Sequence, residues 1–239
     1  MDPRARGPGL TMGQLSDAWD FYRGNRDLVD RAFWQHVKLC AAALGLATLT
    51  GVVLGIVCAK IGRVAAFFVA SISNLGRTVP TFAVMGIVLT LSTVGFWPAV
   101  VGLYVLAVPP ILLNTFTGIQ QVDAGVVEAS QGMGFRPLQI LGQVEIPLAV
   151  PLIFAGVRTA AVEVVATATL AGLVGGGGLG QVVLSGLDTG QNDVLLAGAI
   201  PIALLALGVQ LLFGGLEHFA TPRGLRVTRG LAIHEGRFT

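Results

Sequence analysis

The chain has 239 residues, of which 54% are hydrophobic and only 12% are charged, with a mean hydropathy of +0.77 and a formal net charge of +2. Soluble domains carry roughly 25% charged residues, so this composition excludes an ordinary soluble domain and indicates a protein that lies in lipid. The net charge is small and the basic residues are scattered along the sequence, which excludes an extended nucleic-acid surface.

Residues 1–36 mix arginines with five aspartates and lack the apolar core of a cleavable signal peptide. Five aromatic side chains are concentrated near their end: Trp19, Phe21, Tyr22, Phe33 and Trp34. We expect an extracytoplasmic N-terminal segment that lies at the membrane interface as a helix. An aromatic cage for a quaternary ammonium group is the alternative use of these rings.

Long apolar runs follow, and they predict an all-α polytopic membrane bundle, because backbone groups in hydrocarbon must be bonded within a helix. About 20 apolar residues cross a bilayer. We expect five transmembrane helices, near 37–59, 64–91, 97–119, 147–173 and 194–216. A six-span alternative divides the long second run into two crossings at RTVP, residues 77–80.

The basic residues predict the orientation of this bundle. With five spans, Lys60, Arg63, Arg136 and the arginines of the tail share one side, whereas the loops 92–97 and 174–193 contain no Lys or Arg. The positive-inside rule then places the loop 120–146 and the tail 217–239 in the cytoplasm and the N-terminus outside. The arginines of the N-terminal segment fit this rule less well.

Between the third and fourth spans lies a polar interruption, EASQGMGFRPLQILGQVEIP, from Glu128 to Pro147. Asp123 is expected to cap a short helix, Gly134 to end it, and Pro147 to lie in the first turn of the next span. A loop of this length inside a compact domain is usually functional, and a short exposed helix suits docking into a groove of a soluble protein. A solvated connector is the alternative.

The interruption also resembles a known family. EAS at 128–130, three residues, Gly134, nine residues and VEIP at 144–147 resemble the "EAA" signature of binding-protein-dependent ABC-transporter permeases. Three residues depart mildly from it: Ser130, Val144 and Ile146. The resemblance implies a type I ABC importer permease fold over residues 37–216, with a coupling loop that contacts an ATP-binding cassette subunit. The implied coupling residues are Glu128, Ala129, Ser130, Gly134 and Pro147.

Four longer stretches resemble the osmoprotectant subgroup of these permeases, whose members import glycine betaine, carnitine, choline or similar quaternary amines. They are RTVPTFAVMGIVL (77–89), LLNTFTGIQQVDAGVVEASQGMG (112–134), VEIPLAVPLIFAGVRTAAV (144–162) and TATLAGLVGGGGLG (167–180). The resemblance implies a bacterial cytoplasmic-membrane location, a second permease, identical or paralogous, and an extracytoplasmic substrate-binding protein. Another small solute, such as an amino acid, and an ion-coupled secondary transporter are the alternatives.

The residues offer no catalytic constellation, and we expect a transport subunit that is not an enzyme. The chain contains no P-loop sequence, so ATP hydrolysis by that route is excluded and ATP and magnesium are expected on a partner. His36, His218 and His234 have no ligand at metal spacing, and we expect no metal site. Cys40 and Cys58, about 27 Å apart on one helix, cannot form a disulfide.

Polar residues inside the apolar runs are candidates for the translocation path: Arg77, Pro80, Asn114 and Glu163. Because an ionised side chain at mid-bilayer costs about 2.5–3.5 kcal/mol on insertion scales, Arg77 and Glu163 are expected to face water or a partner. Alternatively, Arg77 reaches an interface and Glu163 is protonated and packed. We expect Arg158 to bind a helix end or a lipid phosphate.

The glycine-rich stretch GGGGLG, residues 175–180, formally matches a dinucleotide-binding pattern. That site requires a preceding strand and a later acidic residue, whereas a membrane helix precedes this stretch, so we exclude nucleotide binding. The glycines either let the helices shift between two states or allow close packing.

Overall fold

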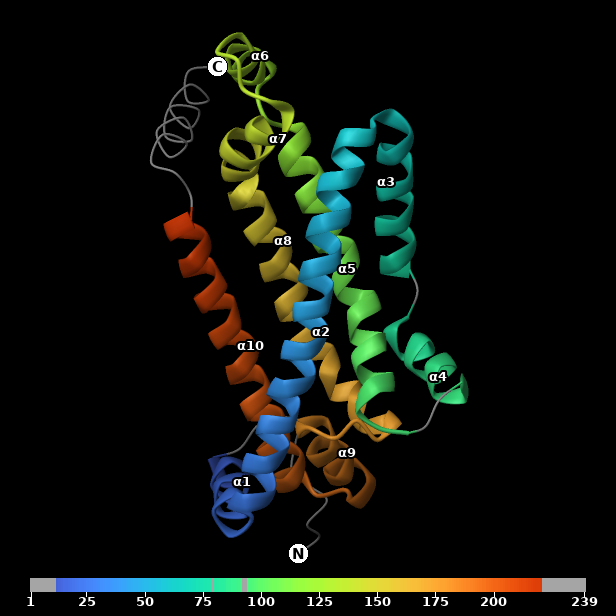
Figure 1. Cartoon of the computed structure of the whole chain (residues 1–239). Helices are drawn as coiled ribbons and strands as arrows, with labels where there is room; N and C mark the ends of the chain where they lie inside the picture. The colour runs from blue at the N-terminus through green and yellow to red at the C-terminus, as the bar shows by residue number, and fades with distance from the viewer. Residues whose placement is uncertain (1–11, 79, 92–93, 221–239) are drawn as a thin grey trace, which may run out of the picture.

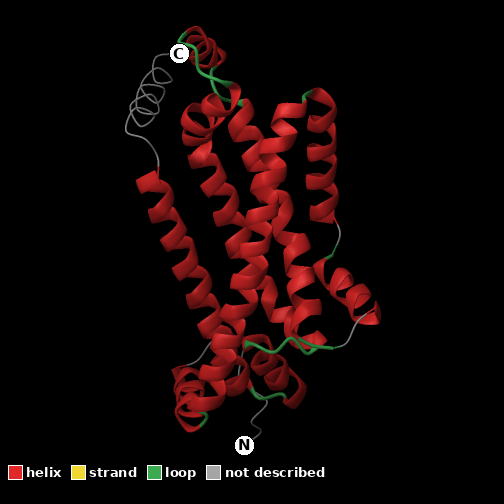
Figure 2. Ribbon diagram, viewed as in Figure 1, coloured by secondary structure: helices red, strands yellow, loops and turns green. Residues whose placement is uncertain are grey.

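The computed structural model of the chain describes residues 12–78, 80–91 and 94–220. All regular structure within these ranges is helical, which confirms the predicted all-α bundle (Figure 2). The segments 1–11 and 221–239, which belong to the predicted N-terminal segment and tail, lie outside the described residues.

The helices follow one another along most of the described chain. The elements are α1 (Met12–Gly24), α2 (Arg26–Ile61), α3 (Arg63–Thr78), α4 (Thr81–Leu91), α5 (Phe96–Gln120), α6 (Ala124–Gly132), α7 (Pro137–Ile140), a π-helical turn (Leu141–Glu145), α8 (Ile146–Thr167), a 3-10 helix (Ala168–Val174), α9 (Leu179–Thr189) and α10 (Asn192–Ala220). Four of the described helical segments are long and apolar enough to cross a membrane: Arg26–Ile61, Phe96–Gln120, Pro137–Val174 and Asn192–Glu217.

The predicted second span consists of two shorter helices, α3 and α4. At 1.5 Å per residue they measure about 24 Å and about 16 Å, so neither alone covers the ~30 Å of a bilayer core. They are separated at Pro80, whose carbonyl accepts hydrogen bonds from Ala83 and Val84 in the first turn of α4. Figure 1 shows α3 and α4 as successive parts of one passage along the bundle, which favours five passages over six.

The two ends of the bundle are distinct (Figure 1). One end carries α6, the α2–α3 junction and the end of α10, and we call it the α6 end. The other end carries α1, α9 and the start of α5, and we call it the α9 end. Lys60 and Arg136 therefore lie at the same end, as the predicted topology requires.

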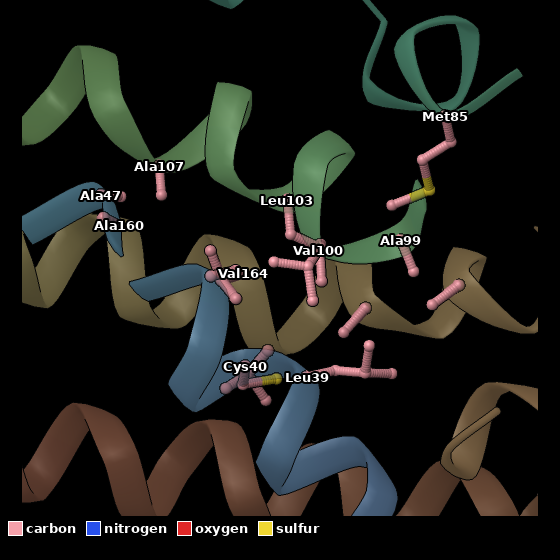
Figure 3. Packing of buried hydrophobic residues seen from close by; sticks show 14 of the residues in the cluster. Leu39, Cys40, Ala47, Met85, Ala99, Val100, Leu103, Ala107, Ala160 and Val164 are labelled. Atoms are coloured by element: carbon pink, nitrogen blue, oxygen red, sulfur yellow. The ribbon is translucent and has the colours of Figure 1, made fainter. Parts of the chain in front are cut away.

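The core lies where α2, α5 and α8 pack together, and small residues allow their close approach (Figure 3). Ala43, Ala47, Ala107 and Ala160 have no exposed surface. A Cβ added to Gly55 would lie 2.6 Å from Thr115 Cβ, so only glycine fits at that crossing of α2 and α5. Small residues at helix crossings are typical of bundles in lipid, where packing replaces the hydrophobic effect.

Large apolar side chains cover much of the outside of this bundle. They include Leu49, Phe67, Phe68, Leu204 and Leu211, each more than half exposed. An exposed apolar surface of this extent would be a liability in water but is the expected surface of a protein in lipid.

Three boundaries differ from the predicted ones. Helix α2 begins at Arg26 rather than near residue 37, because the polar turns before the apolar run are also helical. The fourth span is continuous with α7 and therefore begins at Pro137, ten residues before Pro147. The expected loop 174–193 contains the helix α9, Leu179–Thr189, which is flanked by Gly178 and Gly190.

Candidate functional site

The site begins with the predicted short helix α6, whose first turn is capped by Asp123. The Asp123 carboxylate accepts hydrogen bonds from the backbone N–H groups of Gly125, at 2.7 Å, and Val126, at 3.2 Å. The first N–H groups of a helix lack the regular partner four residues earlier, so a carboxylate at this position stabilises the helix start. The predicted N-cap is confirmed.

The end of α6 is set by Gly134, which has a φ of +84°. The Gly134 N–H bonds to the Gln131 carbonyl at 2.9 Å, and the Phe135 N–H bonds to the Ser130 carbonyl at 3.2 Å. This pair of bonds is a Schellman motif, which ends a helix at a residue with positive φ and favours glycine there. The sequence prediction that Gly134 stops the helix is confirmed.

Helix α6 projects from the end of the bundle and presents a mixed surface (Figure 1). Glu128 and Ala129 are exposed, whereas Ser130 is buried and donates a hydrogen bond to the Val126 carbonyl at 2.7 Å. Two large apolar side chains near the end of the helix and on α7 are strongly exposed, Met133 at 69% and Leu138 at 81%. A short helix with both ends fixed that exposes a carboxylate and, toward its end, large apolar groups is suited to docking on a protein.

The loop returns to the bundle through a π-helical turn, Leu141–Glu145. Pro147 follows it in the first turn of α8, as predicted. Because proline has no N–H and its ring displaces the carbonyl four residues earlier, a regular α-helix is disfavoured directly before it. Single π turns inside longer helices occur frequently at functional sites.

The two ends of the loop contact the same part of α2. At the start of the loop, Gln120 Nε2 donates a hydrogen bond to the Ala59 carbonyl at 2.8 Å. At its end, Lys60 forms an ion pair with Glu145, whose side chain is 7% exposed. Sequence reasoning missed this pair. The available signal was that each charge stands at the edge of an apolar run that ends at the same side of the bundle.

A second ion pair joins α8 to α10. Arg158 Nη1 lies 3.2 Å from the Glu217 carboxylate, and Arg158 Nε donates to the Gln210 side-chain carbonyl at 3.1 Å. Arg158 thus binds polar side chains of a neighbouring helix, not the helix end or lipid phosphate expected from the sequence.

The glycine-rich stretch at the α9 end packs closely against α2. Gly175, Gly177 and Gly178 have φ values of +71°, +77° and +82°, and the Gly178 N–H bonds to Gln35 Oε1 at 3.2 Å. A Cβ added to Gly180 would lie 2.0 Å from the Thr169 carbonyl oxygen. The structure therefore supports the close-packing interpretation of these glycines.

The adjacent residue of α2, His36, is fully buried against the same stretch. Its Nε2 lies 3.1 Å from the Val165 carbonyl oxygen, which it contacts as a hydrogen-bond donor. A Cβ on Gly178 would lie 3.2 Å from the His36 Cα. Gln35 and His36 thus fix the glycine-rich stretch to α2.

The candidate path residues are distributed over three elements. Asn114 lies in α5 at the contact with α8 and donates a hydrogen bond to the Pro110 carbonyl at 2.8 Å. Glu163 is exposed on α8, and Pro80 is exposed at the α3–α4 break. The Arg77 side chain lies outside the described part of the structure, and with it the hypothesis of an Arg77–Glu163 pair.

The family model described as "Binding-protein-dependent transport system inner membrane component" matches residues 51–222. The chain is 39% identical to the carnitine transport permease protein OpuCB of Listeria monocytogenes, over 82% of this chain and 89% of that protein. It is 35% identical to the choline transport system permease protein OpuBB of Bacillus subtilis strain 168, over 83% and 91%. It is 36% identical to the osmoprotectant import permease protein OsmW of Salmonella typhimurium, over 81% and 92%.

Solved structures with the same fold include an inward-facing form of the MetNI methionine ABC transporter, with a TM-score of 0.72 and 23% identity over 82% of this chain and 97% of that chain. An amino acid ABC transporter with histidines has a TM-score of 0.65 and 19% identity over 88% and 98%. These likenesses establish the fold, a type I ABC importer permease.

Proposed function

This chain belongs to the family of binding-protein-dependent transport system inner membrane components, and on that premise we propose that it carries a small osmoprotectant such as carnitine, choline or glycine betaine. As a member, it is a multi-pass membrane permease subunit and not an enzyme. It forms the membrane part of an ABC importer, and ATP hydrolysis belongs to a partner subunit.

The proposed solute class rests on the relatives rather than on a pocket. Relatives named for carnitine, for choline and for osmoprotectants are 39%, 35% and 36% identical to this chain, each over more than four fifths of its length. A further relative is named for glycine betaine, carnitine and choline together. The solved structures named for methionine and for amino acids are at most 23% identical, so they support the fold and not an amino acid as solute.

The coupling role is assigned to the loop 120–146. We assign the contact with the ATPase partner to the surface of α6 that carries Glu128 and Ala129. The other coupling residues, the buried Ser130, Gly134 just past the helix end and Pro147 at the return to the bundle, are assigned to holding this surface in place. What supports this is the fixed geometry of α6, with an Asp123 cap and a Gly134 stop, together with the exposure of the large apolar side chains Met133 and Leu138 in the same loop. A rigid helix transmits a displacement, whereas a flexible connector absorbs it.

The proposed arrangement in the membrane places the α6 end and the tail 217–239 in the cytoplasm and the segment 1–36 outside. The positive-inside distribution of Lys60 and Arg136 supports it. The outer side would then meet a substrate-binding protein, and a second permease would complete the path. Arg77, Pro80, Asn114 and Glu163 remain the proposed path residues.

The test measures solute uptake by cells that express this chain together with its ATPase and its binding protein. These cells contain no other osmoprotectant importer. Labelled glycine betaine, carnitine and choline are offered separately, and a labelled amino acid is offered in a parallel assay. We expect uptake of at least one quaternary amine, its loss when ATP is depleted under an intact ion gradient, and its persistence when the gradient is collapsed while ATP is maintained.

Two results would contradict the proposal at different levels. Uptake of an amino acid with no uptake of any quaternary amine would overturn the solute class alone. Uptake that persists without ATP and fails without the gradient would overturn ATP-driven import in favour of a secondary transporter.

A further inference from the structure

Both ends of the loop 120–146 are bonded to two adjacent residues of α2. Gln120 is the last residue of α5 and bonds to Ala59, while Glu145 closes the π-helical turn and pairs with Lys60. Ala59 and Lys60 lie at the end of α2, before the junction with α3 at Gly62. A helix far from the loop in sequence is thus a third point of attachment, beside α5 and α8.

The bond from Gln120 occupies a group that a helix end leaves free. The last carbonyls of a helix have no intrahelical donor, so Ala59 accepts a hydrogen bond from a neighbouring chain segment at little cost to α2. The same place is packed as well as bonded, because Ala59, Ile119 and Ala149 form a small buried cluster. The ends of α2 and α5 and the start of α8 therefore meet at one point.

The ion pair fixes the other end of the loop. The Glu145 side chain is 7% exposed, and a carboxylate this deeply buried is unfavourable unless a cation and hydrogen bonds compensate for lost solvation. Lys60 supplies that cation while its own side chain remains 45% exposed. The pair therefore constrains where α2 lies relative to the π-helical turn, whatever its net contribution to stability.

The position of the pair relative to the π-helical turn suggests its role. The turn interrupts the α-helical hydrogen bonds between α7 and α8, so it is the place where a displacement of the loop could be lost by local bending. Glu145 ends this turn, and its partner lies on a different helix. A contact across this point carries the displacement to α2 directly.

We propose that Lys60, Glu145 and Gln120 are positioning residues for energy coupling, which make the α6 end of α2 move together with the coupling loop. The proposal rests on the coupling role assigned to α6 above. Helix α2 packs on α5 and α8 throughout the core, so its displacement reaches the whole bundle. ATP hydrolysis on the partner is then converted into movement of three helices and not of two.

The test compares transport with ATP hydrolysis in the complete complex, reconstituted in vesicles. The double variant Lys60→Met with Glu145→Leu removes both charges and keeps apolar volume, an exchange that folded proteins often tolerate. We expect the double variant to assemble and to hydrolyse ATP, while the number of solute molecules moved per ATP falls on the order of fivefold, the lower range of coupling between sites. Gln120→Leu should lower the same ratio by less, and Lys60→Arg should retain it.

The matched control is a second inter-helix ion pair, removed by Arg158→Met with Glu217→Leu. This pair joins α8 to α10 and does not involve the loop. We therefore expect the complex that lacks it to move as many solute molecules per ATP as the wild type. A charge exchange, Lys60→Glu with Glu145→Lys, should move more solute per ATP than the Lys60→Met with Glu145→Leu variant does. A purely structural role would not require this recovery.

The possible results separate this inference from the proposed function. If the wild-type complex couples ATP to uptake and the double variant does so equally well, the positioning role is overturned and the proposed function stands. If both Lys60→Met with Glu145→Leu and Gln120→Leu simply fail to assemble, the contacts are structural and the inference is overturned as well. If the wild type moves no solute with ATP, the proposed function itself fails.

Discussion

The two ends of the bundle are held together by different kinds of contact. At the α6 end, polar side chains reach between segments, as in the Lys60–Glu145 pair and the hydrogen bond from Gln120 to the Ala59 carbonyl. At the α9 end, backbone lies against backbone around Gly178 and Gly180, where a single added Cβ has no room. Ion pairs and hydrogen bonds join segments that are otherwise separate, so that these segments can move together, whereas close backbone packing allows little change in shape. The comparison indicates that the α6 end is built to transmit movement and that the glycine-rich stretch at the α9 end is built to hold its shape.

The largest effect is expected from Gly180→Ala. The new Cβ would lie 2.0 Å from the Thr169 carbonyl oxygen and 2.6 Å from its carbonyl carbon, so backbone must move. We expect a loss of about 3 kcal/mol in free energy of unfolding, the upper end for overpacked cores, measured as a lower Tm of the purified complex in detergent. The control is Gly208→Ala in α10, where nothing lies within 4 Å of the added atom. Equal Tm values for Gly180→Ala and Gly208→Ala would contradict the claim that close backbone packing holds the α9 end.

A smaller effect is expected from Gly134→Ala at the end of α6. Its φ of +84° is costly for a residue with a Cβ, about 1–2 kcal/mol, although no atom lies within 4 Å of that Cβ. We expect the last turn of α6 to open more often, seen as faster hydrogen exchange of its amides. Gly132→Ala is the matched control, because it has equal space and no positive φ. Faster exchange in both variants would mean that α6 is not fixed by Gly134.

The smallest effect is expected from Asp123→Ala at the start of the same helix. Loss of the cap leaves the N–H groups of Gly125 and Val126 without their carboxylate partner, at a cost of about 1 kcal/mol. Hydrogen exchange in α6 should rise while the Tm of the complex stays unchanged, because the helix projects from the bundle. Asp123→Asn should keep the cap. A fall in Tm equal to that of Gly180→Ala would show that α6 belongs to the core.

The α6 end was the more predictable of the two from sequence. The cap at Asp123, the stop at Gly134 and the proline at 147 are local signals, each acting within a few residues, and all three are confirmed. The helix α9 was missed, because its start after Gly178 depends on contacts with Gln35 and His36, more than 140 residues away. Its own sequence offers glycines at both ends, which are also typical of a loop.

The sequence also left open which charges form ion pairs between helices. Lys60 and Glu145 are separated by 85 positions, and the spacing of charges along the chain does not determine which helices become neighbours. Glu217, the partner of Arg158, follows the last apolar run rather than lying within a predicted span, so the sequence does not connect the two charges. Helix order alone was predictable, but the lateral arrangement of α2, α5, α8 and α10 required the structure.

The most direct test of the account is a disulfide or bifunctional cross-link from α6 to the ATPase partner. Glu128→Cys is introduced after Cys40 and Cys58 are replaced by alanine, so that the new thiol is the only one in the chain. We predict an adduct with the ATPase in the assembled complex and no labelling of this thiol in intact cells by a membrane-impermeant reagent. Labelling from outside, with no adduct to the ATPase, would contradict the claim that α6 receives the driving movement.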